Sequence, residues 1–423
     1  MNLIQKLRSK LNKKLSNQFV RNIGWLGLSE ILYRVARIGL VIIAVKFLTP
    51  YDYGLGAILM TVREYSLTFS NIGITAKIIQ AEEQELEALC NSGYWLNWTI
   101  FVSLFIIQCL ASYPISLFYK THDIILPICV SSIVYLLWPI TTIQKTLIQR
   151  ENRFKIIAFT DTIQNMVATI LCTVFAVLGM GVWSFVIPIL LVPFIEVYMY
   201  YKHHSWRQRK GFTTKYWHEI FSFGKNLLGV NLFRTLRNNL DYLIIGHFIG
   251  VKELGVYFFG FNTGLGISLS IINSINSAIL PHLCEARNDW NEFKRRYFSS
   301  LKTISFVIIP FVLLQSSLAP FYVPIVFGEK WIPATPILVL ICLSAIPRPF
   351  ADAASQLLVA IDKPELDLRW HFIFTGIFTV AVLIGVYWNV IGVAASVLLV
   401  HVICLPIFTV WASNYVFPKS KDL

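Results

Sequence analysis

The sequence predicts an all-α integral membrane protein with about twelve transmembrane helices in two parallel repeats of six. Three observations lead to this prediction. Hydrophobic residues make up 56% of the 423 residues and charged residues only 14%, and the mean hydropathy is +0.63, which is typical of a membrane protein rather than of a soluble domain. The apolar residues form stretches long enough to cross a hydrocarbon core of about 30 Å. These stretches share sequence landmarks between the two halves of the chain.

Each stretch contains about twenty mainly apolar residues, the length that a membrane-spanning helix needs, and short polar clusters separate one stretch from the next. In the first half the stretches lie at 23–45, 54–77, 94–118, 124–148, 156–178 and 182–201. In the second half they lie at 227–249, 254–283, 299–323, 332–360, 368–387 and 391–411. We expect each of them to form a helix.

The basic residues predict how the helices are oriented. With the N-terminus inside, twenty-five Lys and Arg residues fall at cytoplasmic ends and four fall in outer loops, namely Lys46, Lys120, Lys252 and Lys330. This positive-inside asymmetry places both termini in the cytoplasm. The net charge of +13 does not indicate a nucleic-acid partner, because the basic residues lie in separate loops rather than on one folded face.

The apolar stretches and the basic loops together divide the chain into five predicted regions. The expected order is a cytoplasmic amphipathic segment at 1–22, an N-terminal six-helix lobe at 23–201, a basic cytoplasmic linker at 202–224, a C-terminal six-helix lobe at 225–413 and a cytoplasmic tail at 414–423.

Three landmarks recur in the same order in both halves, at offsets of 204, 201 and 211 residues. They pair RNI at 21–23 with KNL at 225–227, FLTPYDYG at 47–54 with FIGVKELG at 248–255, and GVWS at 181–184 with GVAA at 392–395. Six helices per unit is an even number, so both units begin on the same side of the membrane. The repeats are therefore parallel and related by an axis along the membrane normal.

Motifs for several other activities are absent from the sequence. No G-x-x-x-x-G-K-[ST] run is present to bind ATP, and no H-E-x-x-H or G-x-S-x-G motif is present. The seven cysteines lie singly, without the spacing of a zinc or redox site. We therefore expect no cofactor, no metal and no enzymatic activity.

Charged residues inside the predicted spans are the candidate functional residues, because charge in hydrocarbon costs about 2.5 to 3.5 kcal/mol and usually faces a cavity. Glu30, Arg34 and Arg37 recur at helical spacing, and so do Arg234, Arg237 and Asp241, at corresponding places in the two halves. Each group forms a polar face on its helix, and we expect both polar faces to line the same cleft. The candidate anion-binding residues are Arg34, Arg37, Arg234, Arg237, Arg63 and Arg348, and the candidate coupling carboxylates are Asp161, Asp241 and Asp352.

Two interpretations of these arginines stay open. A guanidinium offers a planar fork of donors and stays charged, which suits a diphosphate or an acidic sugar. Alternatively, Arg34 pairs with Glu30 and Arg237 pairs with Asp241 to fasten helices together.

The sequence resembles a known family in three places besides its overall profile: FLTPYDYGLGAI at 47–58, LIQRENRFK at 147–155 and GMGVWSFV at 179–186. These runs are similar to the polysaccharide-export branch (Wzx-type flippases) of the multidrug/oligosaccharidyl-lipid/polysaccharide exporter superfamily. The resemblance covers essentially the whole chain and is sharper in the first half. It implies the V-shaped, two-lobed exporter fold.

The resemblance further implies a flippase that moves undecaprenyl-diphosphate-linked oligosaccharide across the bacterial cytoplasmic membrane by alternating access, for O-antigen, capsule or exopolysaccharide synthesis. It leaves open the polysaccharide polymerase machinery as a partner. An ion-coupled multidrug exporter is an alternative, although such proteins favour acidic cavities for cationic drugs. A membrane glycosyl polymerase or ligase needs a long outer loop for its catalytic groups, and every predicted outer loop is short. A channel or purely structural protein leaves the charged central faces unexplained.

Overall fold

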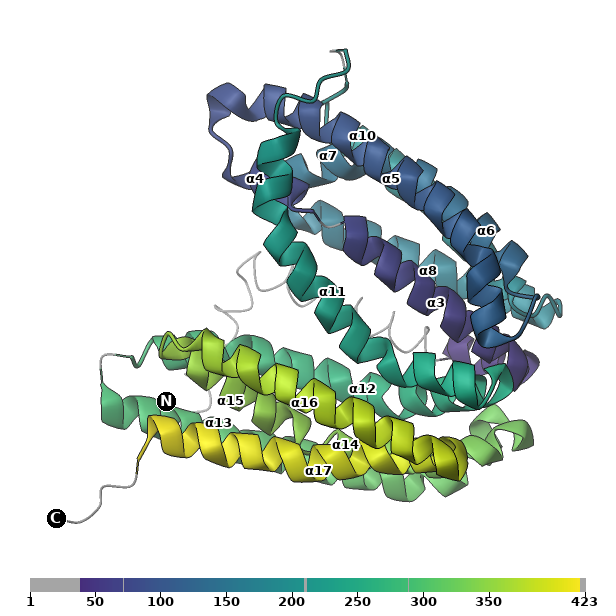
Figure 1. Cartoon of the computed structure of the whole chain (residues 1–423), viewed down its shortest axis with the longest axis vertical. Coiled ribbons are helices and arrows are strands. Elements are labelled where there is room, and N and C mark those ends of the chain that lie inside the picture. The colour runs from purple at the N-terminus through teal and green to yellow at the C-terminus, as the bar shows by residue number, and fades with distance from the viewer. Residues whose placement is uncertain (1–38, 71, 209–210, 288, 419–423) are drawn as a thin grey trace, which may run out of the picture.

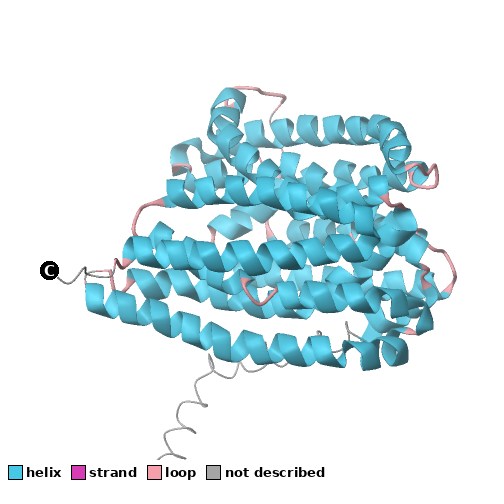
Figure 2. Ribbon diagram, turned by 60° about the horizontal axis from the view of Figure 1, so that its bottom comes forward, coloured by secondary structure: helices cyan, strands magenta, loops and turns pink. Residues whose placement is uncertain are grey.

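The computed structural model describes residues 39–70, 72–208, 211–287 and 289–418, and all regular structure within these ranges is helical (Figure 1, Figure 2). The prediction of an all-α protein is confirmed. The first expected span, at 23–45, lies mostly outside the described residues. Every later expected span coincides with a helix or with two or three consecutive helical segments.

In the first half the structure has these helices: α3 (Pro50–Ser70), α4 (Ile74–Gln80), α5 (Glu83–Tyr119), α6 (Ile125–Ser132), the short η1 (Ile133–Leu136), α7 (Trp138–Arg150), α8 (Phe154–Val177), α9 (Trp183–Leu191) and α10 (Pro193–His203). Several of the breaks follow from proline. Pro139 and Pro193 stand in the first turns of α7 and α10, where a missing N–H is tolerated.

In the second half the structure has these helices: α11 (Trp217–Phe248), α12 (Val251–Cys284), α13 (Trp290–Tyr322), the short η2 (Val323–Phe327) and η3 (Glu329–Ala334), α14 (Thr335–Ser344), α15 (Arg348–Ala360), α16 (Pro364–Gly385), η4 (Val386–Trp388) and α17 (Asn389–Val416). The helix α11 begins ten residues before the expected span at 227, so the segment between α10 and α11 is shorter than the expected linker.

Six helical stretches of the described chain are long and apolar enough to cross a membrane, or up to eight if each of two bent pairs is one span. One stretch, Pro364–Val416, has 53 residues, which as a straight helix would be about 80 Å long. It folds back on itself, since the ring of Trp370 stacks on that of Phe408 at 4.7 Å and Phe374 contacts His401. This stretch therefore contains two spans, as expected for 368–387 and 391–411.

The helices form two groups that diverge from one end (Figure 1). The first group contains α3 to α10 and the second contains α12 to α17, while α11 runs between them and packs against α3, α4 and α5 as well as α12 and α16. The groups meet where α3 packs along α12. We call this the closed end. It contains the starts of α3 and α12, and the opposite end, with the loops after α7, α10, α12 and α15, is the open end.

An aromatic cluster fills the closed end. Tyr53 of α3 contacts Phe259 of α12 at 6.2 Å and Trp331 of η3 at 5.0 Å between ring centroids. The indole Nε1 of Trp331 donates a hydrogen bond of 3.1 Å to the carbonyl of Val45. These buried rings join the two groups and exclude water from their meeting point.

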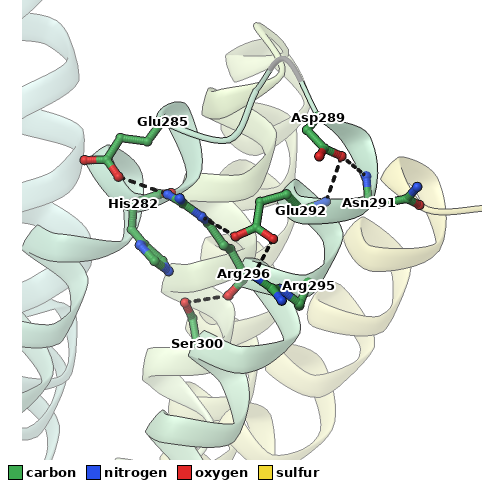
Figure 3. A network of polar contacts seen from close by, with 8 residues as sticks. All are labelled: His282, Glu285, Asp289, Asn291, Glu292, Arg295, Arg296 and Ser300. Carbon is green, nitrogen blue, oxygen red and sulfur yellow. Dashed lines mark hydrogen bonds and ion pairs between the residues drawn. The ribbon is translucent and has the colours of Figure 1, made fainter.

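At the open end, a polar network fixes the connection from α12 to α13 (Figure 3). Asp289 caps α13, because its carboxylate accepts hydrogen bonds from the backbone N–H groups of Asn291 and Glu292 at 3.0 and 3.1 Å. Arg296 binds Glu292 and also Glu285 at the end of α12, both at 3.0 Å. The loop is thus held by charges that stay in water.

Candidate functional site

A cavity of about 630 Å³ lies in the second half, and residues from α3, α11, α12, α15, α16 and α17 line it. Its walls combine aromatic rings with ionisable side chains. The acidic, basic and histidine lining residues are Glu64, Arg237, Asp241, Arg348, Asp352, His371 and His401. Such charged groups inside a membrane-embedded bundle indicate a site for a polar ligand.

Arg237 enters this cavity from α11. Its Nη1 lies 2.8 Å from Nδ1 of His371 on α16, and the other ring nitrogen of His371, Nε2, lies 3.5 Å from Oδ2 of Asp367. Guanidinium, imidazole and carboxylate thus form a chain that runs along the wall of the cavity. A guanidinium has five N–H donors, and the contact with His371 uses one of those of Arg237.

Asp241 lies one turn further along α11 and is 3% exposed. Its carboxylate accepts a hydrogen bond of 2.7 Å from the hydroxyl of Tyr257 and one of 3.0 Å from the backbone N–H of Tyr242. The interpretation in which Arg237 and Asp241 pair with each other does not describe this structure. Asp241 instead ties α11 to α12.

Arg348 opens α15 and reaches the same cavity, one helical turn before Asp352. Its Nε is buried and has no hydrogen-bond partner in the described part of the chain. A buried donor of a charged group without a partner is costly. Arg348 therefore has a buried donor that no group in the described part of the chain satisfies.

A second cavity, of about 660 Å³, lies in the first half. Arg63 lines it with its guanidinium 5.6 Å above the ring of Trp138, and its buried Nε likewise lacks a partner among the described residues. Lys145 and Glu196 also line this cavity, with 3.7 Å between their charged groups. In the described part of the chain, each half thus has a cavity lined by an arginine whose Nε lacks a partner.

The two cavities meet at α3, because Met60 lines both. Beside it, Asn239 of α11 donates to the carboxylate of Glu64 at 3.1 Å and lies within 3.4 Å of the hydroxyl of Thr61. The hydroxyls of Thr68 and Thr235 lie 2.9 Å apart, about one helical turn from Glu64 and Asn239. Polar contacts between α3 and α11 thus lie beside the place where the two cavities meet.

The candidates from the sequence occupy different places. Arg237, Asp241, Arg348 and Asp352 surround one cavity, and Arg63 lines the other. Arg234 is exposed and lines neither of these two cavities, and Asp161 also lies outside both linings. Arg34 and Arg37 lie outside the described residues.

His371 and His401 were missed in the sequence, where only arginines, lysines and carboxylates inside spans were considered. Both are single histidines within apolar helices, α16 and α17, and a search for every ionisable residue in a span would have found them. Trp370 was missed for another reason. Its neighbour Phe408 comes from a different helix, so its place in the cavity wall depends on how α16 folds back on α17.

The fold defines the class of protein. It is similar to an inward closed conformation of the lipid II flippase MurJ, with a TM-score of 0.67 and 17% identity over 90% of this chain and 87% of that one. It is also similar to an inward-facing multidrug resistance MATE family transporter of the MOP superfamily, with a TM-score of 0.68 and 13% identity over 92% and 96% of the two chains. The protein has the two-lobed fold of this exporter superfamily.

The sequence comparisons then give the family. Residues 43–336 match the model of a family described as polysaccharide biosynthesis protein, and the chain belongs to this family. It is 24% identical to an uncharacterized membrane protein in the cps region of Klebsiella pneumoniae, over 91% of this chain and 80% of the relative. It is also 24% identical to the lipopolysaccharide biosynthesis protein WzxC of Escherichia coli, over 90% and 77%. The expected resemblance to the polysaccharide-export branch is confirmed.

Proposed function

We propose that this protein is a flippase that carries an oligosaccharide linked to a lipid diphosphate, undecaprenyl diphosphate in particular, across the bacterial cytoplasmic membrane. The observation that supports this most is the cavity in which Arg237 and Arg348 converge from two helices. A diphosphate group has oxygens that can accept hydrogen bonds from two arginine forks at once.

The unused donors of the two cavities fit the same ligand. After a change of side-chain rotamer, the Nε groups of Arg63 and Arg348, which are buried here, would gain partners from phosphate or sugar oxygens. Aromatic faces in these cavities, such as Trp370 in the cavity that Arg348 lines, provide surfaces on which sugar rings stack. The charged head would occupy the cavity while the lipid chain stays in the bilayer, so the protein needs to shield only the polar part.

The divergent arrangement of helices suits alternating access. We place the open end in the cytoplasm, because the positive-inside rule puts both termini there, and we assign 23–201 and 225–413 to the two lobes that rock against each other. The structure then corresponds to a state in which the closed end blocks the outer side. Rocking would open the contact between α3 and α12 and close the opposite end.

Export of cationic drugs is the second candidate. The carboxylates of Glu64, Asp241 and Asp352 line the same cavity as the arginines, and the fold matches a multidrug transporter as well as a lipid flippase. Asp241 is already bound by Tyr257 and Tyr242, however, which leaves fewer carboxylates to bind a cation.

The two candidate functions predict different phenotypes for a cell that lacks the protein. The flippase predicts that a deletion strain accumulates lipid-linked oligosaccharide on the inner leaflet, lacks surface polysaccharide and recovers when the wild-type chain is supplied. Its sensitivity to cationic drugs should not change. Normal surface polysaccharide together with increased drug sensitivity would contradict the flippase and favour the exporter.

A further inference from the structure

The hydrogen bond between Arg237 and His371 fixes the protonation of the histidine. A guanidinium has only donors, so Nδ1 of His371, at 2.8 Å from Nη1, must accept. An imidazole that accepts at Nδ1 is neutral and has its proton on Nε2. Asp367 lies 3.5 Å from Nε2, where its carboxylate favours that tautomer. The observed contact therefore requires a neutral His371.

Adding a proton to Nδ1 would destroy this contact. The new N–H would point at the N–H groups of Arg237, and two positive charges would stand at hydrogen-bond distance in a partly buried site. Such repulsion is strong where the dielectric constant is low. The proton on His371 and the present position of Arg237 thus exclude each other.

Charged groups on all the surrounding helices act on this pair. Arg234 lies on the same helix as Arg237, Arg348 and Asp352 lie on α15, Asp367 lies on α16 and His401 lies on α17. The arginines oppose a second positive charge at His371, while Asp352 and Asp367 favour it. An anion beside Arg237 would add to the second effect and give the guanidinium another acceptor.

We propose that His371 is a proton-binding site that releases Arg237 toward an anionic ligand, so that a proton and a diphosphate bind the cavity together. The proposal rests on the proposed function, because it takes the diphosphate as the ligand. Reciprocity follows from linkage: if the anion favours the proton, the proton favours the anion by the same factor. The cavity then has a proton site linked to the anion, on a histidine rather than on the carboxylates considered above.

The test is direct binding to the purified full-length protein in detergent, with dimethyl diphosphate that carries one methyl group on each phosphorus as the probe. This diester of diphosphoric acid keeps its two charges constant between pH 5.5 and 8, so changes in affinity come from the protein. We expect wild-type affinity to rise as pH falls, by up to about tenfold per pH unit for one linked proton. Proton uptake on binding, measured in weak buffer, should accompany the rise.

The informative variant is His371→Asn, whose side-chain oxygen can accept from Arg237 at the place of Nδ1 but cannot titrate. Its affinity should be nearly independent of pH and should lack the proton uptake. His218→Asn, at an exposed site on α11, should behave as wild type. Wild-type binding without pH dependence or proton uptake, or full pH dependence in a folded His371→Asn protein, would overturn the proposal. This experiment measures binding and not transport. A failure of the proton-linkage proposal can therefore be distinguished from a failure of the flippase function.

Discussion

Gly54 and Gly255 each lie against the backbone carbonyl at the start of the other's helix. A Cβ added to Gly54 would overlap the carbonyl oxygen of Val251, and one added to Gly255 would overlap that of Pro50. The two glycines are paired by the sequence repeat, so the contact is nearly symmetric between the halves. It allows α3 and α12 to cross with their backbones touching, and it forms the tightest part of the closed end.

Alanine at either glycine should push α3 and α12 apart. Backbone atoms cannot move aside as a flexible side chain can, so we expect a cost of about 1 to 3 kcal/mol and a lower midpoint of thermal unfolding in detergent. Gly376→Ala is the matched control, since nothing lies within 4 Å of its added Cβ and alanine is the better helix former. Equal midpoints for Gly54→Ala and Gly376→Ala would contradict the close crossing.

Arg150 should stabilise the end of α4. Its Nη1 donates to the carbonyls of Ile78, Ile79 and Ala81 at 2.7 to 3.0 Å, which replaces bonds that a helix end lacks. We expect Arg150→Ala to cost about 1.5 to 3 kcal/mol, the range for hydrogen bonds to a charged group. The check is the rate of proteolysis at residues 78–83. Arg153→Ala removes only an exposed ion pair and should change little; equal effects of the two variants would refute this role of Arg150.

Acid should loosen the start of α13. The hydrogen bonds from Arg295 and then Arg296 hold the pKa of Glu292 below its ordinary value of 4.5. A lowered pKa in the folded state means that this stabilisation is present above about pH 4.5 and is lost as pH falls through the lower folded value. Hydrogen exchange at residues 285–296, corrected for intrinsic rates, should therefore speed up below pH 4.5 in wild type.

Glu292→Gln gives the control for this pH effect. Glutamine keeps the shape but has no charge to lose, so its exchange should already be faster at pH 7 and should change less on acidification. An unchanged acid response in Glu292→Gln would assign the effect to another group, such as the capping carboxylate of Asp289.

More of the fold than of the candidate site could be predicted from the sequence. Apolar length and the repeated landmarks placed every span after the first on a helix, because hydrocarbon forces each span to satisfy its own backbone hydrogen bonds. Helical spacing also put Arg237 and Asp241 on α11. It could not show that Asp241 binds Tyr257 rather than Arg237, because that depends on the packing of α12 against α11.

Other parts of the site depend on contacts between distant segments. The sequence treated Arg234 and Arg237 alike, since both lie in the same polar stretch, yet the two side chains differ in whether they reach the cavity. The partner of Arg237 is 134 residues away along the chain. No spacing rule connects them, and only the folded arrangement of α11 and α16 does.

The most direct test of the proposed function is translocation of a fluorescent lipid-diphosphate-linked saccharide in vesicles that contain the purified protein. The double variant Arg237→Ala, Arg348→Ala should lose transport by at least about tenfold, since each arginine would contribute charge-assisted hydrogen bonds of about 1.5 to 3 kcal/mol. Arg369→Ala, which alters an exposed arginine of α16 that lines neither cavity, should stay within about twofold of wild type by the same reasoning. A folded double variant with wild-type transport would contradict the assignment of the cavity as the path of the substrate.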